Sequence, residues 1–313
     1  MNWILPITKL KMNQASNQNT YTGIWLAVLA TFIWSGNFIV AKAVTKDIPP
    51  ISLNFYRWLV AAIIIFPFVF KKIKAEWKTV IQSWHYLFWI SLTGIALFNT
   101  FVYIGAHYTS AINLALIGTT SSPIMSVLFA RIFLKEKIGW MKLTGMILCI
   151  IGVLFLLSKG NFQTLLSLRF SKGDLWVLLS AFCFAVYNTL VKKKPAALSP
   201  ANFLFVIFSF GTLMVLPFYL WEVNHTVPVT WNINLVLAIL YLGAGASVIC
   251  FLIWNVAIGK LGAGRTALFG NLIPVFSSIE AAIFLHEIFT LVHAISMIIV
   301  FIGILLANWK LRQ

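Results

Sequence analysis

The sequence contains little charge for its length. Only 10% of its 313 residues are Asp, Glu, Lys or Arg, and seven of these are acidic, while 61% of the residues are hydrophobic. A mean hydropathy of +0.94 lies outside what a water-soluble domain of this size tolerates. The composition therefore predicts a chain whose surface lies mostly in lipid.

Residues that build metal and catalytic sites are also scarce. The three cysteines lie inside apolar runs without metal-ligand spacing, and the five histidines fall near helix ends or in loops. We find no zinc-binding His pair, no nucleophile–base constellation and no phosphate-binding glycine loop. A membrane-embedded enzyme would need clustered carboxylates or histidines at one membrane face. We therefore expect no metal, no cofactor and no enzymatic activity.

A cleavable signal peptide is not visible at the N-terminus. Residues 1–20 have only a short apolar segment, followed by Lys9, Lys11 and a run rich in Asn, Gln and Ser. This order differs from the basic, apolar and small-residue sequence of a signal peptide. We expect residues 1–20 to form a cytoplasmic tail.

Long apolar runs fill the rest of the chain. A bilayer core of roughly 30 Å needs about 20 apolar residues per helical crossing. Ten such segments are predicted at 23–44, 52–70, 84–106, 111–133, 141–158, 173–191, 201–221, 233–258, 263–285 and 290–309. The prolines at 49–50, the lysines at 71–72 and the Lys-Pro run at 192–195 mark the clearest breaks.

The basic residues lie between these segments and predict the orientation of the chain. With the N-terminus on one side, 17 of the 23 Lys and Arg residues fall on that side, five fall on the other, and Arg57 lies inside a helix. The positive-inside rule then places both termini in the cytoplasm. A net charge of +16 distributed in this way reflects topology, and we expect no nucleic-acid partner.

The two halves of the chain repeat each other. At an offset of 150 or 151, Gly, Pro and Glu residues coincide as well as apolar ones, which composition alone does not produce. The diagnostic pairs are Pro50 and Pro200, Gly94 and Gly245, Pro123 and Pro274, Glu136 and Glu287, and Gly152 and Gly303.

Five crossings per half place the start of the second half on the opposite side of the membrane, so the repeats are inverted. We predict an all-α membrane protein of ten transmembrane helices, divided into a tail at 1–20, a first repeat at 21–158, a periplasmic linker at 159–172 and a second repeat at 173–313. Inverted repeats can form two exchangeable arrangements around a site near the midplane, which is the physical basis of alternating access.

The repeats resemble the drug/metabolite transporter superfamily in its ten-helix form with two EamA-type domains. The resemblance covers about residues 21–310 and rests on TFIWSGNFIVAKAV, NFYRW, YTSAINLALIGTTSSPIMSVLFARIFLKEK and GKLGAGRTALFGNLIPVFSSIEAAIFLHEIF. It implies a carrier in the bacterial inner membrane with a central cavity between the halves, moving amino acids, nucleosides, drugs or other metabolites.

Within this class we expect a small metabolite, an amino acid or a related amphipathic compound, to be exported by alternating access, by a monomer or a homodimer. This narrower expectation rests on the resemblance alone. A passive channel or a lipid-handling membrane protein is the alternative.

Polar and aromatic residues inside the predicted helices are the candidates for lining the cavity. An aromatic wall with a few amides suits amphipathic metabolites and can hold an ammonium group. The candidates are Trp34, Asn37, Asn99, Tyr103, Tyr187, Asn188, Trp254, Asn255, Asn271 and Ser277.

Glu280 is the one carboxylate well inside an apolar segment. Its repeat partner is Phe129, and similar proteins commonly have a small or apolar residue there. An isolated carboxylate is expensive in lipid, so Glu280 should face the bundle interior. It is either a proton-coupling or cation-binding group, or a neutral acid hydrogen-bonded to a neighbouring helix.

Three other charged residues are expected to have structural roles. Arg57, which resembles an Arg common in the family, either snorkels and pairs with a loop carboxylate such as Asp47 or helps to hold an anionic group. Glu136 and Glu287 close equivalent helices, where they would cap the following helix or lock the short turn.

Pro123 and Pro274 are predicted to interrupt their helices at mid-membrane. Each would free backbone carbonyls that a ligand or a nearby Ser can use. A kink that lines the cavity is one interpretation, and tight packing of small residues is the other.

Overall fold

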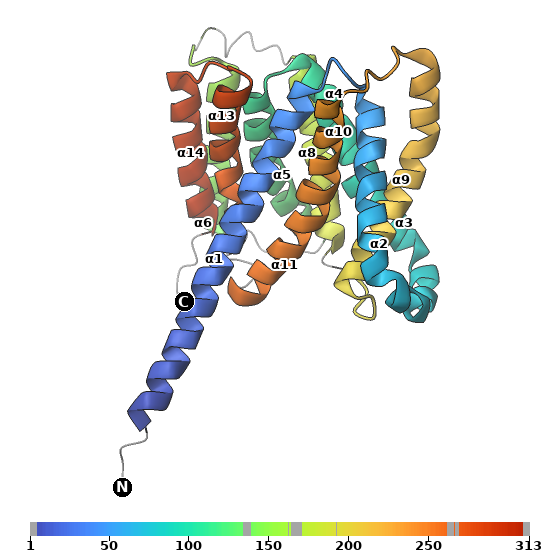
Figure 1. Ribbon diagram of the computed structural model, residues 1–313. Coiled ribbons are helices and arrows are strands. Elements are labelled where there is room, and N and C mark those ends of the chain that lie inside the picture. The colour runs from blue at the N-terminus through green and yellow to red at the C-terminus, as the bar shows by residue number, and fades with distance from the viewer. Residues whose placement is uncertain are drawn as a thin grey trace.

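The computed structural model describes residues 5–133, 139–161, 163, 171–191, 193–261, 266 and 269–308, and every element within these ranges is helical (Figure 1). In chain order the elements are α1 (Leu5–Ala43), α2 (Pro50–Gln82), α3 (Trp84–Ser91), η1 (Leu92–Leu97), α4 (Phe98–Tyr108), α5 (Ala111–Phe133), α6 (Trp140–Leu157), α8 (Lys172–Val191), α9 (Pro200–His225), α10 (Ile233–Leu240), η2 (Tyr241–Ile249), α11 (Cys250–Leu261), η3 (Gly270–Leu272), α13 (Ile273–Phe284) and α14 (Leu291–Asn308).

In the described part of the chain, these elements make ten crossings, which confirms the predicted fold class. Segments α3, η1 and α4 form one crossing, α10, η2 and α11 form another, and η3 leads directly into α13. Six helices are long and apolar enough to span a membrane, and shorter apolar helices occur at Leu143–Leu156, Ile273–Phe284 and Leu291–Gly303. The chain is a multi-pass membrane protein.

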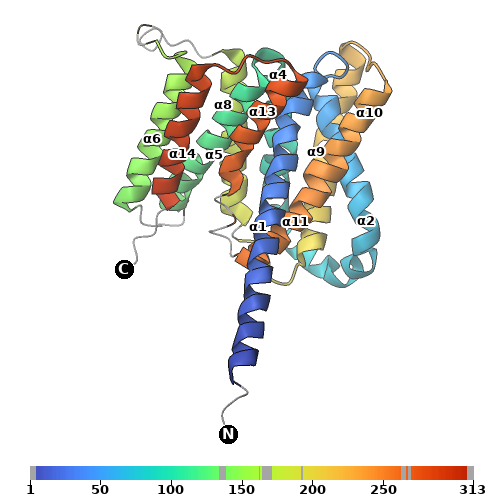
Figure 2. The ribbon, with the colours of Figure 1, turned by 60° about the vertical axis from the view of Figure 1, so that its left-hand side comes forward.

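Helices α1, α2 and α9 extend beyond the predicted segments, α1 and α2 by the most. Helix α2 continues through Lys71 and Lys72 to Gln82. Lysine is a good helix former, so a pair of lysines does not by itself end a helix. Helix α1 begins at Leu5, and its N-terminal part projects from the bundle (Figure 1). It begins on the side of the bundle on which α14 ends (Figures 1 and 2).

The helices of the two halves pack in the pairs that a two-fold axis generates. Helix α5 packs on α8, and in the other orientation the equivalent helix α13 packs on α1. In the same way α4 packs on α8, and its equivalent α11 packs on α1. Two further pairs, α2 with α9 and α6 with α14, join equivalent helices of the two halves. The α6–α14 pair lies at one edge of the bundle and the α2–α9 pair toward the other (Figure 2). The fold is therefore two inverted five-helix repeats.

Both halves contain a widened helical turn at the same place. The π-helical segments η1 and η2 include Gly94 and Gly245, which are equivalent in the two repeats. At Gly94, an added Cβ would lie 2.1 Å from a ring carbon of Tyr187, so glycine is required for that ring to pack. Segments of this kind are rare and are frequently found at functional sites.

Helices α6 and α14 approach closely through small residues. A Cβ on Gly303 would lie 2.7 Å from the carbonyl oxygen of Gly145 and 2.9 Å from the backbone nitrogen of Cys149. The Ser296 hydroxyl donates to the carbonyl of Gly152 at 2.7 Å. Backbone contact of this type is how membrane helices associate without a hydrophobic driving force.

Substituting Gly303→Ala should separate α6 from α14, because the added methyl meets backbone rather than a side chain that can move. We expect the variant to lose about 1–3 kcal/mol of stability despite the better helix propensity of alanine. A lower melting temperature in detergent would report the loss. Gly139→Ala is the control, because its Cβ would have nothing within 4 Å and should leave the melting temperature unchanged. Equal melting temperatures for the two variants would contradict the packing argument.

Candidate functional site

Most of the described carboxylates bind the N-termini of helices. Glu222 of α9 accepts the backbone N–H groups of Ile51 and Ser52 at 3.1 and 2.6 Å and the Ser52 hydroxyl at 2.8 Å. Reciprocally, Glu76 of α2 accepts the backbone N–H of Ser199 at 2.9 Å and its hydroxyl at 3.2 Å. The first turn of a helix has unpaired N–H groups and a positive dipole end, so both carboxylates are well placed.

Two more carboxylates accept hydrogen bonds from backbone N–H groups at helix N-termini. Glu287 accepts the N–H groups of Ala111 and Ile112 at 2.8 and 3.2 Å, so it caps α5 of the other repeat rather than the helix that follows it. Asp174 accepts the N–H of Ser171 at 3.0 Å in the first turn of α8. Glu136, the repeat partner of Glu287, lies outside the described residues.

Arg57 lies deep in the bundle, with 4% of its surface exposed. Its Nη1 donates to the side-chain oxygens of Asn37, Asn99 at 3.0 Å and Tyr103 at 2.6 Å. Its Nε donates to the Ser247 hydroxyl at 3.0 Å. This set, called here the Arg57 cluster, joins α1, α2 and α4 of the first repeat to η2 of the second.

The Arg57 cluster contains no negative charge. Its four oxygen ligands are neutral, and among the described residues Arg57 forms no ion pair, with Asp47 or with any other carboxylate. The guanidinium also lies 4.8 Å from the ring centre of Trp58. Of the two alternatives from the sequence, snorkelling with Asp47 as partner does not occur in this structure.

Glu280 is also buried, with 7% of its surface exposed. The Ser35 hydroxyl donates to Glu280 Oε1 at 2.8 Å, while Oε2 has no partner among the described residues. This single contact joins α13 of the second repeat to α1 of the first. The arrangement can hold either a protonated acid or a carboxylate that awaits a cation.

Helix α1 lies between the two buried charges. Ser35, which contacts Glu280, and Asn37, which contacts Arg57, are two residues apart, so their side chains leave the helix about 200° apart. Between them, a Cβ on Gly36 would lie 2.2 Å from the Tyr241 hydroxyl, which donates to the carbonyl of Ile33 at 2.5 Å. Arg57 and Glu280 therefore touch opposite faces of one helix.

The aromatic and amide residues predicted to line the cavity fall into separate places. Trp34 packs with Trp254, with ring centres 5.0 Å apart, and its Nε1 donates to the carbonyl of Ala246. Tyr187 is buried against Gly94, Asn188 is partly buried, and Asn255 is exposed. The side chain of Asn271 lies outside what the structure describes.

Pro274 and Pro123 occupy different positions in their helices. Pro274 lies in the first turn of α13 after η3, where a missing N–H costs nothing, rather than within a continuous helix over 263–285. Its carbonyl accepts the hydroxyls of Ser277 at 3.4 Å and Ser278 at 2.7 Å. Helix α5 continues through Pro123, whose side chain the structure does not describe.

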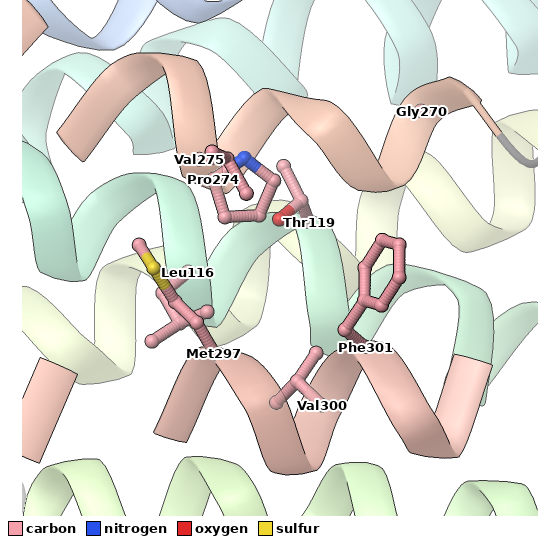
Figure 3. A pocket seen from close by; sticks show the side chains of 8 residues that line it. All are labelled: Leu116, Thr119, Gly270, Pro274, Val275, Met297, Val300 and Phe301. Carbon is pink, nitrogen blue, oxygen red and sulfur yellow. The ribbon is translucent and has the colours of Figure 1, made fainter. Parts of the chain in front are cut away.

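Two cavities lie beside helix α5, away from the buried charges. One, of about 20 Å³, separates α5 from α13 and α14, and has room for roughly one water molecule. Figure 3 shows its lining residues, which are Leu116, Thr119, Gly270, Pro274, Val275, Met297, Val300 and Phe301. The other, of about 220 Å³, is lined by α5, α6 and α8. Neither is lined by the predicted aromatic and amide residues.

Sequence reasoning did not single out Ser247, Trp58, Glu76 or Glu222. Ser247 lies in a run of small residues, and Trp58 adjoins Arg57 in an apolar segment, so neither pattern carried a signal. Glu76 and Glu222 were predicted to lie beyond helix ends. Only the extended α2 and α9 bring them to the N-termini of each other's helices.

Comparison with known proteins agrees with this architecture. The model of the EamA-like transporter family matches residues 21–158 and again residues 171–309. The chain belongs to the EamA-like transporter family. An "uncharacterized transporter" of Archaeoglobus fulgidus is 30% identical over 94% of this chain and 100% of that protein.

Other relatives of this EamA-like transporter are more distant. A "probable amino-acid metabolite efflux pump" of Escherichia coli is 25% identical over 92% of this chain and 95% of that protein. One solved structure superimposes with a TM-score of 0.60, at 18% identity, over 93% of this chain and 96% of that one. The first likeness supports a small-molecule substrate, and the second supports the fold alone.

Replacing Glu222 tests whether carboxylates of one repeat cap helices of the other. Glu222→Ala leaves two N–H groups of α2 without an acceptor, and we expect a loss of about 2 kcal/mol or more. Glu222→Gln keeps one acceptor oxygen and should lose less. Melting temperatures in detergent would rank the variants, with Asn224→Ala on the exposed face of the same helix as the control. A melting temperature for Glu222→Ala equal to that of Asn224→Ala would contradict the capping role.

Proposed function

We propose that this transporter exports an amino acid or a related small amphipathic metabolite by alternating access. The observation that carries the proposal is the pairing of helices across the two repeats. The α5–α8 contact is repeated by α13 and α1, and the α4–α8 contact is repeated by α11 and α1. One packing scheme built twice in opposite orientations allows the halves to exchange roles. The relatives that are named as amino-acid metabolite efflux pumps support the substrate class and the direction.

The substrate site of this proposal lies between the repeats, beside α1. Helix α1 contacts α11 and α13 of the second repeat and carries Trp34, Ser35 and Asn37. The aromatic pair of Trp34 and Trp254 offers an apolar surface across the same boundary. An amphipathic metabolite needs both kinds of surface.

In this proposal, Glu280 couples the binding of a proton or a cation to transport. A carboxylate buried in a membrane bundle, with one oxygen unpartnered, is stabilised by binding a proton or a cation. Its link to Ser35 on α1 connects that event to a helix that touches both repeats. Proton exchange would then favour one of the two arrangements over the other.

The transporter of this proposal works in the bacterial inner membrane, as a monomer or a homodimer, with residues 1–20 and both termini in the cytoplasm. The excess of Lys and Arg on one side of the chain supports this orientation. Residues 159–172 would then join the repeats on the periplasmic face. The substrate therefore leaves through the face where α1 ends.

Counterflow of labelled amino acids into proteoliposomes tests the proposed function directly. We expect saturable, competitor-sensitive exchange that a pH gradient accelerates. Glu280→Gln keeps the size and the hydrogen bond of the side chain but cannot change its charge, so it should abolish the effect of the gradient while exchange persists. Glu222→Gln serves as the control, since its carboxylate caps a helix.

The outcomes separate the parts of this proposal. Flux without saturation or stereoselectivity would favour a passive channel, and no exchange by a folded protein would overturn the amino-acid assignment. An unchanged response to the gradient in Glu280→Gln would remove Glu280 from coupling while leaving transport in place.

A further inference from the structure

A positive charge without a counterion is the least expected feature of this bundle. Arg57 has neutral oxygens around Nη1 and Nε, and its Nη2 has no hydrogen-bond partner among the described residues. Neutral ligands orient a guanidinium, but they do not cancel its charge. A buried ion without a partner of opposite sign costs several kcal/mol.

Of the six described carboxylates, five accept hydrogen bonds elsewhere, and Asp47 forms no ion pair with Arg57. Glu76, Glu222, Glu287 and Asp174 each accept from backbone N–H groups in the first turn of a helix. Glu280 is bound to Ser35 across α1. The described protein therefore provides no anion for Arg57, although acids lie elsewhere in the bundle.

The second repeat has no counterpart of the Arg57 cluster. At the repeat offset, Asn37, Arg57, Asn99 and Tyr103 correspond to Tyr187, Ile207, Cys250 and Trp254. These residues lie in α8, α9 and α11. Helix α4 packs on both α1 and α2, whereas the structure shows no comparable packing of α11 on α8 or α9 among the described residues. The Arg57 cluster therefore belongs to a contact that only one half of the described structure makes.

We propose that Arg57 binds the carboxylate of the transported substrate, which is a carboxylate-bearing metabolite such as an α-amino acid. This inference rests on the proposed function and specifies how its substrate is recognised. Nη1 and Nε are taken by the neutral ligands of the cluster, so the free Nη2, with its two N–H groups, is the nitrogen that binds such a carboxylate. The amides of Asn37 and Asn99 hold the guanidinium in place before the substrate arrives.

A second unpartnered donor lies next to Arg57. The indole Nε1 of Trp58 is buried without a hydrogen-bond partner among the described residues, and the guanidinium lies over the same ring. Buried N–H groups are rarely left unpaired in proteins, and an unpaired group often marks a ligand. An arriving carboxylate brings two oxygens, one for the guanidinium and one for a neighbouring donor.

Chemically matched competitors test this inference. Counterflow with the 20 common amino acids identifies an exchanged one, and its carboxamide and its decarboxylated amine are then tested as competitors in the same proteoliposomes. We expect both analogues to compete about ten- to hundredfold less well than the amino acid, because each lacks the negative charge. Equal competition by the amide and the acid would overturn the assignment.

Variants distinguish substrate binding from a structural role of the arginine. Arg57→Gln should bring the acid-to-amide ratio close to one, and Arg57→Lys should restore part of it, since lysine supplies the charge without the planar fork. Asn224→Ala, on the exposed face of α9, changes no contact of Arg57 and should retain the preference.

A loss of packing alone would lower exchange of all compounds together and leave their ratio unchanged, which would overturn the inference. If Arg57→Gln is not folded, the ratio is measured in Arg57→Lys and in the parent protein. Exchange of no amino acid by the folded parent would overturn the proposed function, and this inference with it.

Discussion

The structure depends on satisfying helix N-termini across the boundary between the repeats. Within a membrane, backbone N–H groups that find no acceptor are costly, and each helix begins with several of them. Glu222 caps α2 from the second repeat, Glu76 caps α9 from the first, and Glu287 caps α5 from the second. A chain with only seven acidic residues thus uses three of them to hold its halves together.

The duplication separates structural features from functional ones. Features that both repeats share belong to the fold: the capping pair of Glu76 and Glu222, the π-helical segments, and the close approach of α6 and α14. Arg57 and Glu280 have no charged equivalents, since Ile207 and Phe129 occupy their places in the other repeat. In the described part of the chain, the buried charges of Arg57 and Glu280 therefore lie where the two-fold symmetry of the sequence is broken.

Much of the fold could be predicted because its signals are local. Apolar runs, charged breaks and the repeated Gly, Pro and Glu positions identified ten crossings and the inverted duplication, and both are confirmed. The end of α2 could not be predicted from Lys71 and Lys72, because lysine has good helix propensity and the helix runs on to Gln82. The 3₁₀ turn η3, which directly precedes α13, likewise does not follow from the apolar run over 263–285.

The candidate site was less predictable, because its chemistry depends on partners distant in sequence. Arg57 and Asn37 could be singled out as polar residues in apolar segments, but their contact with each other and with Ser247 of the second repeat could not. The sequence left Asp47 open as a partner for Arg57, and only the fold shows that, among the described residues, neither Asp47 nor any other acid pairs with Arg57.

Helix α1 connects the two buried charges mechanically. Ser35 and Asn37 lie on opposite faces of the helix, and Gly36 between them leaves room only for the Tyr241 hydroxyl. A rigid helix cannot move one of these faces without moving the other. A change in the charge of Glu280 and a change in the occupancy of Arg57 would therefore act on the same element. No direct contact between the two charges is needed for one event to bias the other, because both would act on a helix that packs on both repeats.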